Sequence, residues 1–309
     1  LFDFKMQVSK SLFKSSKSLS RALYRVPQYS FQHVNDPIGL NEEQISIQQT
    51  ALDFAVKELI PNAGEWDRKH YFPVDTYREA AKLGFGSIYA KPDFGGCGLG
   101  RVEASTIFEA LAYGCPSFSA YLSVHNMVTW IIDSFGTQAQ KEKFVPKLST
   151  MEMFGAYCLT EPNTGSDSAA MQTSAKKVGS DYVINGAKCF ISGGSASDVF
   201  VVMCKTGEKE ISAILVEKGT PGLSFGKMEE KMGWNNQPTV MVIFEDCKVP
   251  QSNLLDKEGN GFRVAMKGLD GGRVNIASCA LGGAAFAMDQ AIEYSKTRKQ
   301  FGKPISEFQ

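Results

Sequence analysis

The feature that most constrains this chain is a change of hydrophobic period along its length. Apolar residues recur every three to four positions from Ile45 to about Leu148, which is the spacing of one face of a helix. Asn41 followed by Gln44 forms a capping box, and the first helix is expected to stop near Pro61. The first folded unit is therefore predicted to be all helical, with further helices over 74–83, 102–113, 117–135 and 138–148.

The period changes near Phe154. Short runs rich in β-branched residues, bounded by turn residues, predict strands over 198–204, 211–216 and 239–244. Asn185-Gly186, flanked by two β-type runs, predicts a hairpin, because this pair readily adopts a type I′ turn. The second unit is predicted to be a β-barrel-like domain.

Helical periodicity returns after Gly261 and extends to about Arg298, with a break expected near Gly271-Gly272. Gly282-Gly283 costs about 1 kcal/mol per glycine relative to alanine, which predicts that another backbone packs closely there. The chain stops at Gln309 soon after this helix, so the third unit is expected to be a helical bundle represented only by its first helix. The predicted domains are 38–152 (α-helical), 153–258 (β) and 259–309 (incomplete bundle).

The N-terminal segment 1–37 has the composition of a mitochondrial transit peptide. Six basic residues and six serines lie between Lys5 and Arg25, and no acid occurs between Asp3 and Asp36. Met6 is the expected start, which leaves residues 1–5 upstream. The alternative is a permanent amphipathic helix that binds a membrane surface. The transit peptide predicts a mitochondrial matrix protein.

Composition argues against several other classes. Thirty-three basic residues balance thirty-three acidic ones, so no net field draws the chain to nucleic acid or an anionic membrane. No apolar run approaches the roughly 18 residues of a membrane span. The seven cysteines are scattered without a CxxC pair and are predicted to be reduced and mostly buried; His33, His70 and His125 lie far apart. Neither a metal site nor a Ser/His hydrolase is favoured.

A polar loop over 155–167 holds the densest group of potential ligand-binding residues. Gly165 permits close approach to the backbone, and Thr160, Thr164 and Ser166 supply donors suited to a heteroaromatic ring or a phosphate. The alternative is a surface turn that caps itself. The glycines over 95–100 have the wrong spacing for a dinucleotide-binding loop and are predicted to form a loop between helices.

The run Tyr-Cys-Leu-Thr-Glu-Pro-Asn-Thr-Gly-Ser-Asp (157–167) resembles the signature of the acyl-CoA dehydrogenase family, and Asn-Gly-Ala-Lys-Cys-Phe-Ile-Ser (185–192) follows at the expected distance. Asp270 to Arg273 resembles the family's acyl-CoA-binding helix start. Arg298 to Gly302 resembles the segment that reaches a neighbouring subunit's flavin. Four ordered blocks on an α, β, α background make the resemblance specific, and it extends from about Asn41 to the last residue.

The resemblance implies bound FAD, with Thr160 on the pyrimidine side of the ring and Ser192 near N5. Phe190 stands where many relatives have tryptophan, and Thr164 where a smaller residue is common. By resemblance, Arg298, Phe301 and Gln309 touch the FAD bound mainly by a partner subunit. The remaining FAD contacts implied are Tyr157, Cys158, Leu159, Glu161, Gly165, Ser166, Phe190 and Ile191.

For the substrate, the resemblance places Ser166, Asp270 and Arg273 on CoA, with Lys227 as a further candidate. Arg273 could alternatively be a solvated helix charge. The blocks 219–226, 233–235 and 275–279 look nearest to members that convert isobutyryl-CoA to methacrylyl-CoA in valine catabolism. Such members are homotetramers that pass electrons to electron-transfer flavoprotein.

The catalytic base in this family lies far downstream of the signature, or in some relatives directly before the helix arginine. Here that earlier position is Gly272, which has no proton acceptor, and Glu161 belongs to the signature loop. The base is therefore expected beyond Gln309, no catalytic residue is assigned, and this chain of 309 residues is expected to be inactive. The alternatives are a dehydrogenase for another short branched acyl-CoA and a non-catalytic acyl-CoA-binding, FAD-binding or assembly protein on the same fold.

Overall fold

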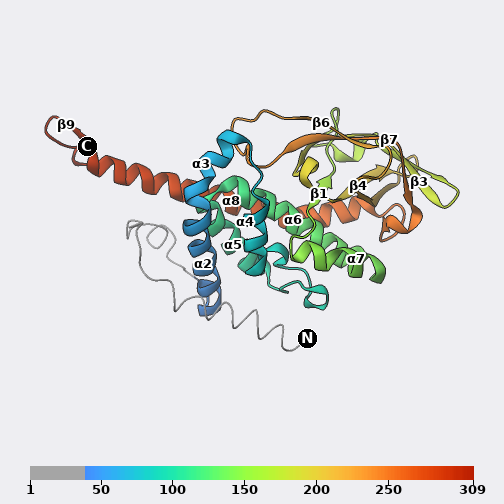
Figure 1. Cartoon of the computed structure of the whole chain (residues 1–309), viewed down its shortest axis with the longest axis horizontal. Coiled ribbons are helices and arrows are strands. Elements are labelled where there is room, and N and C mark those ends of the chain that lie inside the picture. The colour runs from blue at the N-terminus through green and yellow to red at the C-terminus, as the bar shows by residue number, and fades with distance from the viewer. Residues whose placement is uncertain (1–38) are drawn as a thin grey trace.

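The computed structural model describes residues 39–309, and the predicted leader 1–37 lies outside them. The chain first forms a helical domain (Figure 1). As predicted, Asn41 caps the first helix: its side chain accepts from the Gln44 N–H, and the Gln44 side chain accepts from the Asn41 N–H. The helices of this domain are α2 (Glu42–Phe54), α3 (Ile60–Lys69), α4 (Val74–Lys82), α5 (Arg101–Gly114), α6 (Pro116–Phe135) and α7 (Gln138–Ser149).

The expected helix stop near Pro61 is wrong. A π-helical turn over Ala55–Leu59 joins α2 to α3, and Pro61 lies in the first turn of α3. Proline is tolerated there because the first N–H groups of a helix have no intrahelical acceptor. The wider π turn lets the chain restart a helix without a loop.

The core of the helical domain is built from aromatic and aliphatic side chains of α2, α4, α5 and α6. The buried rings of Tyr77 and Phe118 stack with centroids 4.0 Å apart. The glycine-rich segment 95–100 is a loop before α5, as predicted. All seven cysteines are free, and all are buried except the half-buried Cys97.

The middle domain is an eight-stranded sheet with the order β6-β7-β3-β2-β4-β5-β8, and β1 pairs in parallel with β4. Phe200 of β4 and Phe225 of β6 lie far apart in this order, yet their ring centroids are 5.7 Å apart. The sheet therefore curls around its own core, as a barrel-like domain does. Its strands are β1 (Gly155–Cys158), β2 (Ser174–Val178), β3 (Asp181–Ser192), β4 (Val199–Lys205), β5 (Ile211–Glu217), β6 (Leu223–Met228), β7 (Thr239–Pro250) and β8 (Leu254–Leu255).

The hairpin predicted at Asn185-Gly186 is also wrong. Both residues lie inside the single long strand β3, where a register shift against β7 falls between Ile184 and Gly186. The Asn185 side chain bonds Asp246 across the sheet. The hairpin lies earlier, at Gly179-Ser180 between β2 and β3, so pairing across the sheet overrides the local turn preference.

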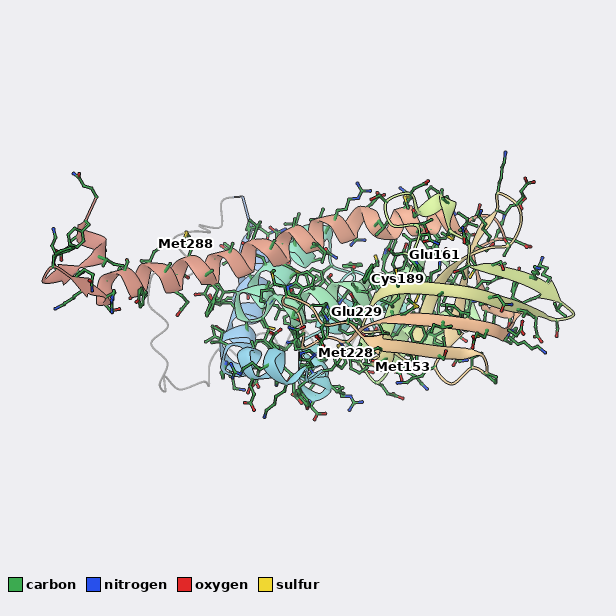
Figure 2. All side chains as sticks on the ribbon, turned by 90° about the horizontal axis from the view of Figure 1, so that it is seen from above. Met153, Glu161, Cys189, Met228, Glu229 and Met288 are labelled. Carbon is green, nitrogen blue, oxygen red and sulfur yellow. The ribbon has the colours of Figure 1, made fainter. Side chains whose placement is uncertain are left out.

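Helix α8 (Gly261–Thr297) runs for 37 residues without the break expected near Gly271-Gly272. Gly271 is buried, and a Cβ there would come within 2.1 Å of the Arg101 guanidinium. The glycine therefore serves packing rather than helix termination. Figures 1 and 2 show the C-terminal part of α8 projecting beyond the body, with the short antiparallel strands β9 (Lys299–Gln300) and β10 (Lys303–Pro304) at its far end.

The two domains and α8 meet along one face of the sheet. Outward-facing residues of β4 and β5, such as Val201 and Leu215, pack with Ile131 of α6, Leu148 of α7 and Val264 of α8 in one core cluster. Further along, α8 packs on α5, where a Cβ at Gly282 would lie 2.0 Å from the Glu109 carbonyl oxygen. This confirms the predicted close backbone approach. Across residues 39–309, no helix is both long and apolar enough to cross a bilayer.

Candidate active site

A pocket of about 430 Å³ lies where the sheet, α6 and α8 meet. The strand side supplies the end of β1 with the two residues that follow it, and the C-terminal part of β3. The helices supply mainly apolar side chains. The lining residues are Ser123, Val124, Met127, Tyr157, Leu159, Thr160, Cys189, Phe190, Ile191, Ser192, Leu269, Gly272, Arg273 and Ile276. None of these is a carboxylate.

The sequence-predicted residues that meet at this pocket come from three separate blocks. Tyr157, Leu159 and Thr160 belong to the signature run, and Phe190, Ile191 and Ser192 belong to the end of β3. Arg273 comes from α8. The first two blocks are brought together because β3 pairs with the loop after β1: the Cys189 N–H donates to the Thr160 carbonyl at 2.9 Å. Helix α8 adds Arg273 because its residue Leu269 packs in one core cluster with Leu159.

The pocket presents polar groups suited to a heteroaromatic ring. The Tyr157 hydroxyl is buried without a hydrogen-bond partner among the described residues. The Thr164 hydroxyl on the adjoining loop is also buried and unpaired among them, but Thr164 does not line the pocket. Burial raises the pKa of Tyr157, so this hydroxyl stays a neutral donor. A buried polar atom left unpaired costs roughly 1–3 kcal/mol, and the N–H and C=O edge of a flavin would relieve such a cost.

Phe190 has an unusual conformation at the pocket mouth. Its φ is +58°, in the left-handed region that disfavours residues with a Cβ, and its side chain is 66% exposed. Strained non-glycine backbone is concentrated at functional sites. The turn in the backbone directs this aromatic side chain to the pocket lining instead of the core of the sheet.

The signature loop closes on itself after Thr160. Glu161 and Thr164 exchange two backbone hydrogen bonds of 3.0 and 3.1 Å, and Gly165 and Ser166 are exposed. The alternative of a self-capped turn thus describes this half of the loop. Ser166 and Gly165 do not line the pocket, and Cys158 points into the core of the sheet.

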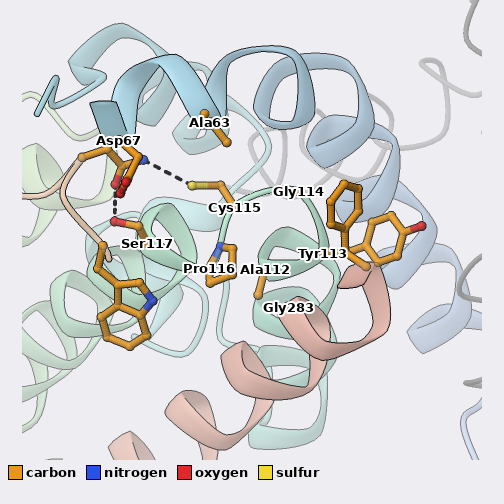
Figure 3. A pocket seen from close by; sticks show the side chains of 13 residues that line it. Ala63, Asp67, Ala112, Tyr113, Gly114, Cys115, Pro116, Ser117 and Gly283 are labelled. Carbon is orange, nitrogen blue, oxygen red and sulfur yellow. Dashed lines mark hydrogen bonds between the residues drawn. The ribbon is translucent and has the colours of Figure 1, made fainter. Parts of the chain in front are cut away.

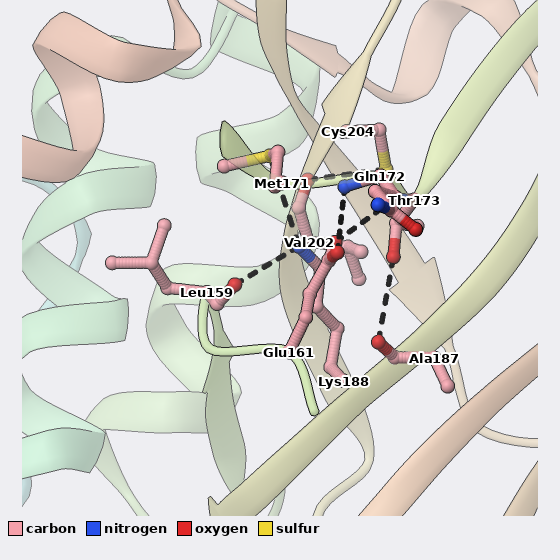
Figure 4. A network of polar contacts seen from close by, with 9 residues as sticks. All are labelled: Leu159, Glu161, Met171, Gln172, Thr173, Ala187, Lys188, Val202 and Cys204. Carbon is pink, nitrogen blue, oxygen red and sulfur yellow. Dashed lines mark hydrogen bonds and ion pairs between the residues drawn. The ribbon is translucent and has the colours of Figure 1, made fainter. Parts of the chain in front are cut away.

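The Glu161 side chain also points away from the pocket. Its carboxylate accepts from the Lys188 ammonium at 2.8 Å and from the N–H groups of Gln172 and Thr173 at 2.6 and 2.9 Å (Figure 4). Burial alone would raise the pKa of Glu161, but these bonds outweigh burial and lower it. A carboxylate held ionised by three donors is poorly suited to accept a substrate proton.

Among the CoA candidates, only Arg273 lines the pocket. It is exposed and forms no ion pair with any residue of the described chain, so its charge is available to a ligand. Asp270 is exposed, and its Oδ2 atom lies 3.8 Å from the Nζ atom of Lys267. Lys227 and Ser166 are exposed and outside the lining.

Arg298, Phe301 and Gln309 are all exposed at the far end of α8, and Phe301 is 96% exposed. Figure 2 shows Glu161 and Cys189 beside the sheet, while Met288 lies well along the projecting helix. Arg298, Phe301 and Gln309 therefore cannot reach the pocket of their own chain.

Several lining residues were not predicted from the sequence. On α8, Leu269, Gly272 and Ile276 share one face with Arg273 at helical spacing, so the arginine could have located them. Ser123, Val124 and Met127 lie on α6, which is buried on nearly all sides. Its sequence gives no signal for the side that meets a ligand.

A second pocket of about 320 Å³ lies at the junction of α3, the α5–α6 turn, the loop before β7 and α8 (Figure 3). Its polar groups already bond one another. Asp67 accepts from the Asn235 N–H at 2.7 Å, and Asn236 bonds both Ser117 and Cys115. These contacts tie the two domains together and leave no polar group that calls for a ligand.

Family models match most of the chain. The N-terminal domain of acyl-CoA dehydrogenase matches residues 41–152, the middle domain 156–247 and the C-terminal domain 259–309. The chain is 54% identical over 279 residues to mitochondrial isobutyryl-CoA dehydrogenase of Bos taurus, covering 89% of this chain and 67% of the relative. Identity to the protein of the same name in Dictyostelium discoideum is 53%, with the same coverage.

Short-chain relatives and solved structures are also similar. A short-chain-specific acyl-CoA dehydrogenase of Clostridium acetobutylicum is 41% identical, covering 88% of this chain and 73% of the relative. The butyryl-CoA dehydrogenase structure from Megasphaera elsdenii superposes with a TM-score of 0.83 at 39% identity, covering 87% and 73% of the two chains. An acyl-CoA dehydrogenase from Bacillus anthracis complexed with FAD gives 0.83 at 34% identity, covering 88% and 47%.

Proposed function

Because the chain belongs to the acyl-CoA dehydrogenase family, we propose that the complete protein oxidises a short branched acyl-CoA, with isobutyryl-CoA as substrate and methacrylyl-CoA as product. The cofactor is FAD, and the pocket between the sheet, α6 and α8 is its site. The observation that carries this proposal is the convergence of Thr160, Ser192 and Arg273 on one pocket. The identity of 54% to isobutyryl-CoA dehydrogenase supports the substrate.

The lining divides into parts with different tasks. When bound, FAD supplies the acceptor for the hydride that leaves the substrate Cβ. Thr160, Ser192 and the unpaired Tyr157 hydroxyl would hold the polar edge of the ring by hydrogen bonds, and Phe190 would supply aromatic contact to it. Val124, Met127 and Ile276 provide an apolar wall that excludes water and suits a short hydrocarbon chain.

One charged side chain of the lining faces the substrate, and the base that the reaction needs is not among the described lining residues. Arg273 at the pocket edge attracts the anionic CoA arm. Removal of the α-proton requires a base, and no described lining residue offers a carboxylate. Gly272 borders the pocket without a side chain, and Glu161 is held by Lys188. We therefore assign the base to a residue outside the described lining.

Family membership, together with the similarity to mitochondrial isobutyryl-CoA dehydrogenase, supports three further assignments for the complete protein. It passes electrons to electron-transfer flavoprotein, and it forms a homotetramer in which Arg298, Phe301 and Gln309 contact a partner's FAD. It also acts in the mitochondrial matrix, as a step of valine catabolism. A fusion of residues 6–40 to a fluorescent protein should enter mitochondria, and diffuse cytosolic fluorescence would argue against the matrix.

The substrate is tested by anaerobic reduction of the FAD-loaded protein. Isobutyryl-CoA should bleach the flavin absorbance faster than butyryl-CoA, isovaleryl-CoA or 2-methylbutyryl-CoA, and mass spectrometry should identify methacrylyl-CoA. Faster bleaching by butyryl-CoA would show that the preferred substrate is a straight-chain thioester and not a branched one. Binding of FAD without bleaching by any thioester would favour a non-catalytic protein on this fold.

A further inference from the structure

We propose that Lys188 is a positioning residue for the cofactor: its buried ammonium holds the segment 159–161 against β3 and so pre-forms the edge of the pocket that carries Thr160 and Ser192. This inference rests on the proposed binding of FAD at that pocket. Lys188 itself does not line the pocket. It acts through the backbone of residues that do.

The burial of Lys188 shows that its contacts are specific. Its side chain is 0% exposed, and an ammonium removed from water is very unfavourable unless it is paired and hydrogen-bonded. Its Nζ donates to the Leu159 carbonyl at 3.0 Å and to Glu161 Oε1 at 2.8 Å, and it lies 3.8 Å from the Met171 sulfur (Figure 4). The ammonium thus spans two loop residues that flank Thr160.

Thr160 is fixed between these two contacts. Its carbonyl accepts from the Cys189 N–H at 2.9 Å. Residues 159, 160 and 161 are therefore each bonded to residue 188 or 189 of β3, and no rotation of the loop is possible without breaking one of these bonds. Both partners of this arrangement continue directly into pocket lining: Thr160 on the loop, and Cys189 to Ser192 on the strand.

A second set of donors determines which residue of the Lys188–Glu161 pair must be the hydrogen-bond acceptor. The Glu161 carboxylate also accepts from the N–H groups of Gln172 and Thr173, on the return limb of the loop. An acceptor is thus required at position 161, and a donor at position 188 faces the Leu159 carbonyl. Exchanging the two residues would place an ammonium against two N–H donors and a carboxylate against a carbonyl oxygen.

A pair that only stabilised the fold would lower the melting temperature without changing the intrinsic affinity for FAD. A positioning pair changes that affinity, because the free protein no longer holds the bound arrangement. The two roles are separated by measuring, on the complete protein, the melting temperature of the FAD-free form and the Kd for FAD by fluorescence. The variants are Lys188→Met, Lys188→Arg, Glu161→Gln and the exchange Glu161→Lys with Lys188→Glu. Lys143→Met is the control, because it removes an exposed lysine whose ion pair with Glu217 lies elsewhere.

We expect Lys188→Met to raise the Kd for FAD about tenfold or more, the factor expected when a hydrogen bond to a charged group is lost. Lys188→Arg, which keeps a donor, should recover part of the affinity, and the exchanged pair should recover none. Lys143→Met should match the wild type. An unchanged Kd in folded Lys188→Met, or restored affinity in the exchanged pair, would overturn the proposal. Failure of the wild type to bind FAD would instead overturn the proposed function.

A measurement on the wild type covers the case in which Lys188→Met does not fold. Hydrogen exchange of the peptide that contains Gln172 and Thr173 should already be slow in the FAD-free protein, because their N–H groups are bound to Glu161 before the cofactor arrives. Fast exchange that becomes slow only after FAD is added would show that the cofactor, and not Lys188, organises the loop.

Discussion

His125 Nδ1 accepts a hydrogen bond from the Gly155 N–H at 3.2 Å, while Nε2 of the same ring lies 2.9 Å from the Leu148 carbonyl oxygen. The imidazole therefore carries its proton on Nε2 and links the end of α7 to the start of β1. It is fully buried, and burial lowers its pKa to about 4. Protonation would place a second donor on Nδ1 against the Gly155 N–H.

This arrangement predicts a specific pH dependence of stability. The unfolded chain protonates this histidine near its ordinary pKa of 6.5, so between pH 6.5 and 4 the unfolded state binds more protons and the free energy of unfolding falls as pH falls. The loss attributable to His125 is about 3 kcal/mol over this window. Denaturant titrations at several pH values should show that the free energy of unfolding falls less steeply with falling pH in His125→Gln than in the wild type. An equally steep fall in both proteins would contradict the assignment.

The approach of α8 to α5 predicts opposite results for two glycines of one helix. Gly282→Ala should lower the free energy of unfolding by about 1–3 kcal/mol or more, since its Cβ would meet the Glu109 carbonyl oxygen at 2.0 Å. Gly272→Ala is the control, because its Cβ would meet only the Met127 sulfur at 3.6 Å and the gain in helix propensity is about 1 kcal/mol. Comparable losses in urea titrations would show that the packing is not the reason for glycine at 282.

Arg273 is predicted to bind the substrate and not the cofactor. Arg273→Ala should raise the Kd for a CoA thioester about 10- to 100-fold, as expected for loss of a bond to a charged group, and leave the Kd for FAD unchanged. The difference from the wild type should shrink with added salt. Arg263→Ala on the same helix, where the arginine pairs with Asp256 at 2.8 Å, provides the control. If Arg273→Ala weakened the binding of the CoA thioester and of FAD to the same extent, Arg273 would have a role in the fold and not in substrate binding.

The backbone at Phe190 predicts a trade between stability and binding. Phe190→Gly should stabilise the FAD-free protein by about 1 kcal/mol, because φ of +58° disfavours a Cβ and the exposed ring leaves no cavity. It should also weaken FAD binding through loss of aromatic surface. Phe190→Leu keeps the strained backbone and should weaken binding without stabilising. If Phe190→Gly bound FAD with the affinity of the wild type, Phe190 would have no role in binding the cofactor.

The elements that sequence predicts well are those whose pattern is local. The apolar spacing of α6 and the β-branched run of β4 fix the type of each element because both lie in a continuous core. Asn185-Gly186 and Gly271-Gly272 misled for one shared reason. Their local preference for a turn or a break is outweighed by distant partners, which are β7 for the first pair and Arg101 for Gly271.

The site shows the same division. The blocks that carry Thr160, Ser192 and Arg273 stand out as motifs, whereas Met127 is one apolar residue among many on a buried helix. Lys188 sits in a strand where a lysine would ordinarily face water. Only the three-dimensional structure shows that it is fully buried and bonded on both sides of Thr160.

The uninterrupted course of α8 fixes the separation between Arg273 and Arg298. From Arg273 to Arg298 the helix rises roughly 37 Å, at about 1.5 Å per residue. If the far end serves a neighbouring chain, each site is a composite of two polypeptides. A chain defective at Arg273 and a chain defective at Arg298 would then complement each other in a mixed oligomer. Some sites would combine an intact Arg273 from one chain with an intact Arg298 from its neighbour.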